Sequence, residues 1–218
     1  MRWSRLGYGL LLASLVLLGG SGCAVVPAYP ADLPPLTPAE TGYGVVPDIS
    51  GQYSDRGSGF EPDGTPQPDM SLRELLRVPG PELASDSARA DDVVVVAMGN
   101  GLLEFQFRRD AALFATLHRH AARVDSGEGG DKSNYTCNKG FVSLVVNADS
   151  LGGWPLGLAF HEESLWCRRA ADGSLIVLDH QLTGALLVVL PMWRRDDVWY
   201  RFPPPVPPSG AGLVPQAP

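Results

Sequence analysis

The segment 93–108 constrains the fold most strongly, because it predicts two antiparallel strands joined by a tight turn. Residues 93–98 are a continuous apolar run with four β-branched side chains. A Gly-Asn-Gly hairpin signal follows at 99–101. Over 103–108, three apolar residues then alternate with three polar ones, which is typical of a strand with one face against a core. The chain must therefore bury one face of an antiparallel sheet.

Further strand signals follow along the chain. Residues 135–146 indicate two strand pieces around a turn, and Asp172-Gly173 is a second hairpin signal. The other segments that we expect to be strands are 48–53, 156–167, 175–178, the wholly apolar 185–190, which suits a buried strand, and 198–202. The predicted fold is mainly β, as an antiparallel meander or small open barrel.

Short helices and loops complete the expected fold. A capping-box pattern predicts a helical turn or two over 71–76. Residues 110–124 fit a helix capped by Asp110, with a strand as the alternative. The Gly-, Pro-, Asp- and Ser-rich segment 54–69 predicts a loop, and 194–197 predicts a turn. We therefore expect one or two short helices beside the strands.

Length and charge narrow the classes of function. The chain has 218 residues, which suits one domain with tails. Its formal net charge is −7, and it contains no basic run. An acidic chain of this kind is a poor candidate for binding nucleic acid, so we expect no nucleic-acid partner.

The residues that could carry chemistry do not match a known catalytic or metal-binding spacing. His118 and His120 share a face only on a strand, and His161 and His180 lie next to acidic residues. We expect ordinary surface or hydrogen-bonded histidines rather than zinc or copper ligands. The chain also has no nucleophile elbow and no glycine-rich phosphate loop. We therefore expect no enzyme activity, no metal and no cofactor.

Two further sets of side chains are candidates for function. Glu162 and Glu163 would point to opposite faces of a strand, so they cannot easily act together as acid and base. Aromatic side chains are candidates for lining a ligand pocket: Trp154, Trp166, Trp193, Trp199 and Tyr200. Lipocalin-like binding of an apolar or envelope-derived small molecule is therefore the alternative function.

The N-terminus carries an export signal. Two arginines precede an apolar run over 6–18, and small residues lead from it to Cys23. The run is shorter than the about 20 residues of a membrane-spanning helix. The small residues resemble a bacterial lipobox, although Gly20 stands where that pattern favours leucine. The resemblance implies acylation of Cys23, palmitate included, and sorting to the outer membrane, because Ala24 rather than Asp follows. A conventionally cleaved secreted protein is the alternative.

The other two cysteines form a candidate pair. With Cys23 acylated, Cys137 and Cys167 remain in an oxidising compartment. Both fall on predicted strands, and neighbouring strands can bring α-carbons within the roughly 4.4–6.8 Å that a disulfide needs. We expect a disulfide between Cys137 and Cys167, with two buried thiols as the alternative.

Four short motifs resemble a group of uncharacterised proteobacterial membrane lipoproteins. They are Ile49-Ser50-Gly51-Gln52-Tyr53, Tyr135-Thr136-Cys137, Asp172-Gly173-Ser174-Leu175-Ile176-Val177 and Trp199-Tyr200-Arg201-Phe202. The resemblance covers roughly the folded part of the chain. It implies an envelope-facing β domain and carries no activity with it.

The expected organisation has four parts. They are a signal peptide (1–22), a lipid-anchored proline-rich spacer (23–47), a β-rich periplasmic domain (48–202) and a disordered proline-rich tail (203–218). An ordered segment lying on the domain is the alternative for the spacer. We expect a periplasm-facing, lipid-anchored outer-membrane lipoprotein that acts as a structural or interaction module. Its expected partners are the membrane, through the anchor, and an envelope protein or a small apolar ligand.

Overall fold

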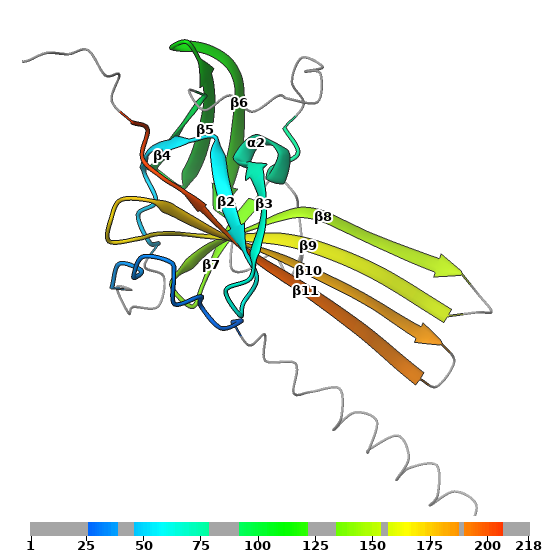
Figure 1. The fold of residues 1–218 in the computed structure, drawn as a ribbon. Helices are drawn as coiled ribbons and strands as arrows, with labels where there is room; N and C mark the ends of the chain where they lie inside the picture. Colours follow the sequence, from blue (N-terminus) through cyan, green and yellow to red (C-terminus); the bar gives the residue numbers. More distant parts are fainter. Residues whose placement is uncertain are drawn as a thin grey trace, which may run out of the picture.

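The structure is a computed structural model that describes residues 26–38, 46–78, 92–121, 134–153, 157–187 and 190–206. The predicted signal peptide, Cys23 and the tail from residue 207 on lie outside these residues. The elements, drawn in Figure 1, are β1 (Gly51–Ser54), β2 (Arg56–Phe60), β3 (Pro66–Ser71), α2 (Leu72–Leu75), β4 (Val93–Gly99), β5 (Leu102–Arg109), β6 (Ala112–Ala121), β7 (Asn134–Asn138), β8 (Phe141–Gly153), β9 (Gly157–Arg169), β10 (Leu175–Leu187) and β11 (Leu190–Phe202).

The described strands form one open sheet. Its order is β1-β4-β5-β6-β7-β8-β9-β10-β11-β2-β3, so the strands from β4 to β11 follow one another in chain order. All neighbouring strands are antiparallel except β6 and β7, which pair in parallel over two residues. The prediction of a mainly β fold with about one short helix is confirmed.

One continuous stretch of chain connects the two ends of the sheet. β1 pairs with β4 at one end, whereas β2 pairs with β11 near the other end. Only Asp55 separates β1 from β2. In addition, the backbone N–H of Ser54 donates to the carbonyl of Pro203, just after β11, at 2.8 Å. The open sheet therefore curls so that its ends meet at Asp55.

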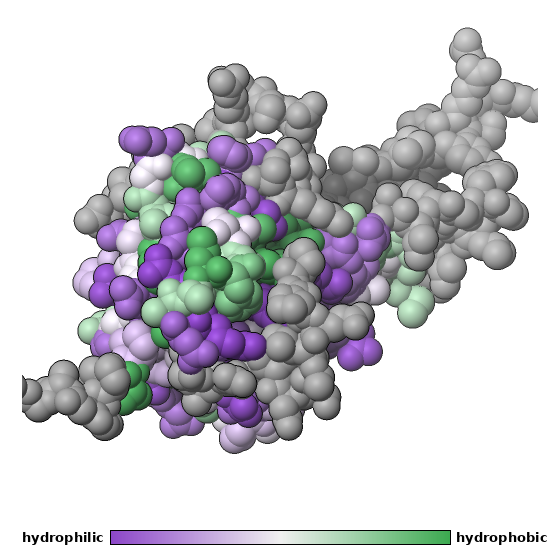
Figure 2. Space-filling model, turned by 90° about the horizontal axis from the view of Figure 1, so that it is seen from above, coloured by the Kyte–Doolittle hydropathy of each residue, from purple (hydrophilic) through white to green (hydrophobic). Residues whose placement is uncertain are grey.

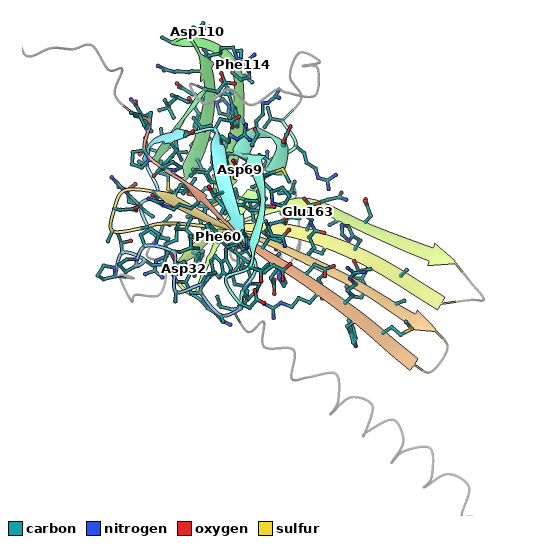
Figure 3. All side chains as sticks on the ribbon, in the orientation of Figure 1. Asp32, Phe60, Asp69, Asp110, Phe114 and Glu163 are labelled. Atoms are coloured by element: carbon teal, nitrogen blue, oxygen red, sulfur yellow. The ribbon has the colours of Figure 1, made fainter. Side chains whose placement is uncertain are left out.

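The two faces of the sheet bury separate clusters, because successive strand residues point to opposite sides. The inner cluster includes Phe105, Leu165 and Tyr200. The outer cluster includes Trp166 and Trp199. Phe114 of β6, at the top of Figure 3, packs against the inner cluster, and Asp32 of the N-terminal segment lies at the lower left of the same view. The alternation predicted over 103–108 is confirmed, since its three apolar residues are fully buried.

Part of the predicted spacer is packed on the outer face. The indole N–H of Trp199 donates to the carbonyl of Ala28 at 3.0 Å, and Leu33 is buried. The hydroxyl of Thr37 donates to the carbonyl of Arg169 at 2.9 Å. Residues 26–38 are thus an ordered segment lying on the domain, which is the alternative that the sequence left open for this stretch.

The tight turns predicted around Asn100 and Lys139 are present in the structure. Asn100 and Gly101 have φ angles of 52° and 74°, and Lys139 and Gly140 have φ angles of 50° and 78°. Two consecutive residues with positive φ are typical of the type I′ turn, which matches the twist of a hairpin. The predicted turn between β9 and β10 is also present, with Gly173 at a φ of 85°.

Four local predictions were wrong. Of the preferred helix over 110–124, residues 112–121 form strand β6 instead, because Asp110 and Ala111 form a positive-φ turn that returns the chain along β5, and residues 122–124 lie outside the described residues. The expected loop over 54–69 contains β2 and part of β3. Of residues 185–190, expected as one buried strand, 185–187 end β10 and Leu190 begins β11, and the expected turn at 194–197 lies within β11.

Four long strands extend beyond the rest of the sheet. β8 to β11 have 13 residues each, but β7 covers only residues 141–144 of β8, and β2 covers only 199–201 of β11. The remaining lengths project together from the body (Figure 1). We call this projection the arm and define it as residues 147–153, 157–163, 181–187 and 190–196.

Candidate functional site

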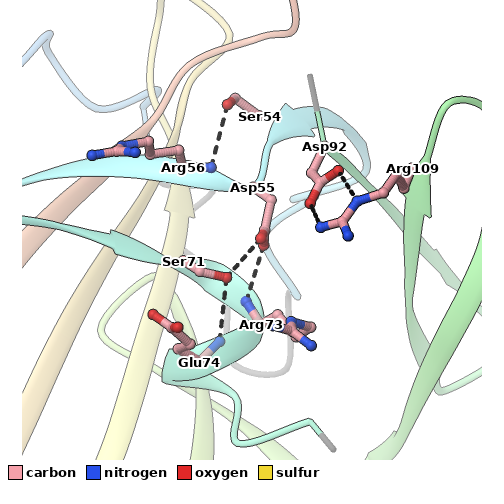
Figure 4. A network of polar contacts seen from close by, with 8 residues as sticks. All are labelled: Ser54, Asp55, Arg56, Ser71, Arg73, Glu74, Asp92 and Arg109. Carbon is pink, nitrogen blue, oxygen red and sulfur yellow. Dashed lines mark hydrogen bonds and ion pairs between the residues drawn. The ribbon is translucent and has the colours of Figure 1, made fainter. Parts of the chain in front are cut away.

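A buried polar network lies where the two ends of the sheet meet (Figure 4). The carboxylate of Asp55 accepts from the hydroxyl of Ser71 at 2.6 Å and from the backbone N–H of Arg73 at 3.1 Å. Its backbone N–H donates to the carbonyl of Asp92 at 2.8 Å, and Asp92 in turn pairs with Arg109. These bonds tie β1, β3 and β4 together, so the network is a structural joint.

The joint has an energetic cost. Burial raises the pKa of Asp55, the hydrogen bonds from Ser71 and Arg73 lower it, and the nearby charge of Asp92 raises it again, so that the pKa ends above its usual value. The buried carboxylates of Asp55 and Asp92 repel each other when both are charged. The positive charges of the nearby arginines offset this repulsion. Arg73 and Arg109 both lie over the ring of Phe114, within 6 Å of its centre.

A second pair of carboxylates lies on the inner face at the base of the arm. Glu163 is 5% exposed and Asp179 is 6% exposed. In the register of β9 and β10, Glu163 is opposite Gln181, two residues from Asp179, so the two acids are diagonal neighbours on one face. Arg77 pairs with Glu163, which Figure 3 places where the arm leaves the body.

Asp179 is the more unusual member of this pair. Its Oδ2 accepts from the side-chain amide of Gln181 at 3.1 Å, but its buried Oδ1 has no hydrogen-bond partner among the described residues. Burial raises its pKa to about 6; the hydrogen bond from Gln181 lowers the pKa, the charge of Glu163 raises it, and the charges of Arg77 and His180 lower it. This carboxyl group can therefore change its protonation near neutral pH. The sequence indicated Asp179 only as a neighbour of His180.

The outer face carries a serine, a histidine and an aspartate in one row. Ser164 and Asp197 lie opposite His180 on the flanking strands, and Nδ1 of His180 lies 2.6 Å from Oδ1 of Asp197. The hydroxyl of Ser164, however, is buried and accepts from the indole N–H of Trp166 at 3.2 Å. The backbone of Ser164 and His180 pairs in the ladder between β9 and β10. We assign this row a structural role.

The remaining histidines make local contacts on strands. His118 and His120 share a face of β6, as the strand alternative required, and Nε2 of His118 lies 3.0 Å from Oε2 of Glu104. Nδ1 of His161 lies 3.0 Å from the hydroxyl of Thr183. In the part of the chain that the structure describes, no three His, Cys, Asp or Glu side chains are close enough to hold a metal ion.

The predicted Cys137–Cys167 disulfide is absent, and both residues are free thiols. The register explains this result, because Cys137 and Cys167 both lie opposite Val142, on either side of β8. Two strand spacings amount to about 9.5 Å, beyond the roughly 7 Å limit for bridged α-carbons. Cys167 is buried, and burial raises its pKa to about 12.

The aromatic residues weighed as pocket lining are dispersed. Trp166 and Trp199 lie in the outer cluster, Tyr200 lies in the inner one, and Trp193 lies on the arm. Trp154 lies outside the described residues. The aromatic residues that we can place do not gather around one site.

An exposed aromatic row crosses the arm. Phe160, Gly184 and Trp193 are opposite one another on three adjacent strands, with the two ring centres 5.6 Å apart. A Cβ atom on Gly184 would lie 2.4 Å from the Phe160 ring and 3.0 Å from Trp193, so only glycine leaves room for the two rings. Trp193 is nevertheless 66% exposed, and Met192 beside it is 58% exposed.

Comparisons of this chain with protein families, with curated proteins and with solved structures give no match. The arm is the strongest candidate for a contact surface because it projects from the body and exposes Met192 and Trp193. Large exposed hydrophobic side chains on a projecting element are typical of interaction sites.

Proposed function

We propose that the protein is a periplasm-facing, lipid-anchored outer-membrane lipoprotein that works as an interaction module through its arm. One observation supports the arm as the contact surface: Trp193 and Met192 are more than half exposed on β11, which runs past the core. A sheet that served only to enclose its core would not need this length or these exposed side chains. Aromatic residues and Met are enriched where proteins make contacts.

The N-terminal segment supports anchoring close to a membrane. Val26 packs against the outer cluster, and Cys23 precedes it by three residues. An extended chain spans at most about 3.3–3.6 Å per residue, so the acylated cysteine would hold the domain within roughly 11 Å. Among the described residues, the structure has no helix with the length and apolar character needed to cross a bilayer.

The alternative function, lipocalin-like binding of an apolar small molecule, has less support. Large core side chains occupy the inner face of the sheet. The polar feature that remains there, the unpartnered oxygen of Asp179, suits a hydrogen-bond donor rather than an apolar ligand. The interaction module is therefore the better-supported proposal.

Membrane fractionation tests the anchor. We expect the full chain, expressed in a Gram-negative host, to appear in the outer-membrane fraction with acyl chains on Cys23 in its intact mass. The Cys23→Ser variant should lose both the acyl mass and the membrane association. Cys137→Ser is the matched control and should behave as the wild type. A wild-type protein whose intact mass carries no acyl chain on Cys23 would contradict the proposal.

Photo-crosslinking in the same cells tests the arm. A photoreactive amino acid at Trp193 should give adducts, because this position is exposed on the arm. The same amino acid at Ser58, which is exposed on β2 in the body, is the control. The arm would not be the contact surface if Ser58 gave adducts and Trp193 gave none.

A further inference from the structure

The arm changes from charged to uncharged at one row of its register. Asp149, His161, Thr183 and Arg194 lie in one row across the four strands. The next row outward is Ser150, Phe160, Gly184 and Trp193. From this row to the end of each hairpin, residues 150–160 and 184–193 contain no charged residue. None of the four strands therefore carries a charged residue beyond the row of Asp149 and Arg194, and the last charged residue of β10 is already Asp179.

The uncharged end has a definite length. Each hairpin contributes four rows, from Ser150 opposite Phe160 to Gly153 opposite Gly157, and from Gly184 opposite Trp193 to Leu187 opposite Leu190. At about 3.4 Å per residue, four rows extend roughly 10–14 Å along the strands. Figure 2 shows the described atoms of the arm changing from purple to pale green away from the body.

We propose that this uncharged end of the arm is inserted into the interfacial layer of a lipid bilayer. The proposal rests on the proposed function, since it names the partner of the same arm. Successive strand residues point to opposite faces, so an uncharged run leaves both faces of the arm without charge. A protein partner on one side would need only one such face, whereas lipid surrounds both.

The boundary rows fit the polar layer of a membrane. Trp193 is exposed at the first uncharged row, and Arg194 follows it in the charged row with its side chain 79% exposed. Trp is enriched at the level of the lipid headgroups, and long basic side chains extend toward the water and phosphates. The packing of Trp193 on Phe160 across Gly184 holds the indole at this level.

The open edges of the arm limit how deeply it can enter the bilayer. Among the described strands, nothing pairs with the outer edge of β8 beyond residue 144 or with that of β11 before residue 199. Open sheet edges are not tolerated within the hydrocarbon core, because their backbone groups would lose their hydrogen bonds. The arm therefore stays at the interface, about 5–10 Å deep, as amphipathic helices do.

A polarity-sensitive fluorophore on single cysteines tests the proposal. The full chain with Cys137→Ser is the parent, and it also serves as the labelling blank. Met192→Cys, Arg194→Cys and Ser58→Cys each add one probe, the first two on the same strand and the same face. The proteins are reconstituted into phosphatidylethanolamine–phosphatidylglycerol vesicles and recovered by flotation. Quenching is then measured with lipids brominated in the upper part of their acyl chains.

We expect a blue-shifted, strongly quenched probe at residue 192, weaker quenching at 194, and none at 58. A probe at 192 that stays unquenched in floated vesicles would overturn the proposal. A blue shift at 192 that needs no vesicles and grows with protein concentration would also overturn it, because a second copy of the chain would then cover the arm.

The same assay separates this proposal from the anchor. The Cys23→Ser change is added to the Met192→Cys protein, and flotation and quenching are both recorded. Unchanged flotation with quenching at 192 supports the arm as a membrane contact that does not need the anchor, and the intact mass of the Cys23 protein then decides the anchor. Flotation that depends on Cys23, together with an unquenched probe at 192, supports the anchor and overturns the arm.

Discussion

Replacing Asp179 with Asn tests whether the buried negative charge of Asp179 lowers the free energy of unfolding. Asp179 is buried beside Glu163, and its pKa is raised from 3.8 to about 6, mainly by burial. Its Oδ2 accepts a hydrogen bond from Gln181. Asn keeps an oxygen for that bond and can donate from its amide toward Glu163, so the substitution removes the charge while preserving the shape.

The size and sign of the effect follow from the pKa. One pKa unit corresponds to about 1.4 kcal/mol, so a shift of roughly two units makes ionised Asp179 cost on the order of 3 kcal/mol in the folded state. Because the folded pKa lies above the unfolded one, this cost is absent below about pH 4 and complete above about pH 6. We expect Asp179→Asn to raise the free energy of unfolding by about 1–3 kcal/mol at pH 7, and by much less at pH 4.

Urea unfolding of the full chain at several pH values between 4 and 7, followed by tryptophan fluorescence, measures this difference. The control is Asp196→Asn, whose half-exposed side chain pairs with Arg194 on the arm. It should change the stability by less than about 0.5 kcal/mol at every pH. A stability difference for Asp179→Asn that does not depend on pH, or a loss of stability at pH 7, would refute the reasoning.

Three further predictions concern packing, the polar joint and the thiols. Gly184→Ala should destabilise the protein by about 1–3 kcal/mol and alter the near-ultraviolet circular dichroism, because its new methyl group meets the aromatic rings; Gly99→Ala, with open space around it, is the control and should change neither. Asp55→Ala should cost about 2–4 kcal/mol in urea unfolding, since it leaves buried donors without an acceptor; a loss below about 0.5 kcal/mol would contradict the structural role of the joint. An alkylating reagent followed by mass spectrometry should modify Cys137 in the folded protein and Cys167 only after unfolding, and rapid labelling of folded Cys167 would contradict its burial.

The strands and turns that depend on local chemistry could be predicted from the sequence. The alternation over 103–108, the positive-φ turns at 100–101 and 139–140, and the cap at Ser71 are all present in the structure. Each is decided within a few residues, because side-chain direction, glycine's freedom at positive φ and capping hydrogen bonds are short-range effects.

How segments distant in the sequence meet depends on the tertiary structure. The same residues 112–121 that suit a helix form a strand because β5 offers them a full ladder of partners. Cys137 and Cys167 remain apart because β8 pairs between them. The raised pKa of Asp179 and the packing of 26–38 on the sheet depend on strands far apart in sequence. The alignment of the uncharged ends of the four arm strands depends on their register. Burial and strand pairing are non-local, so a pattern within one segment does not contain them.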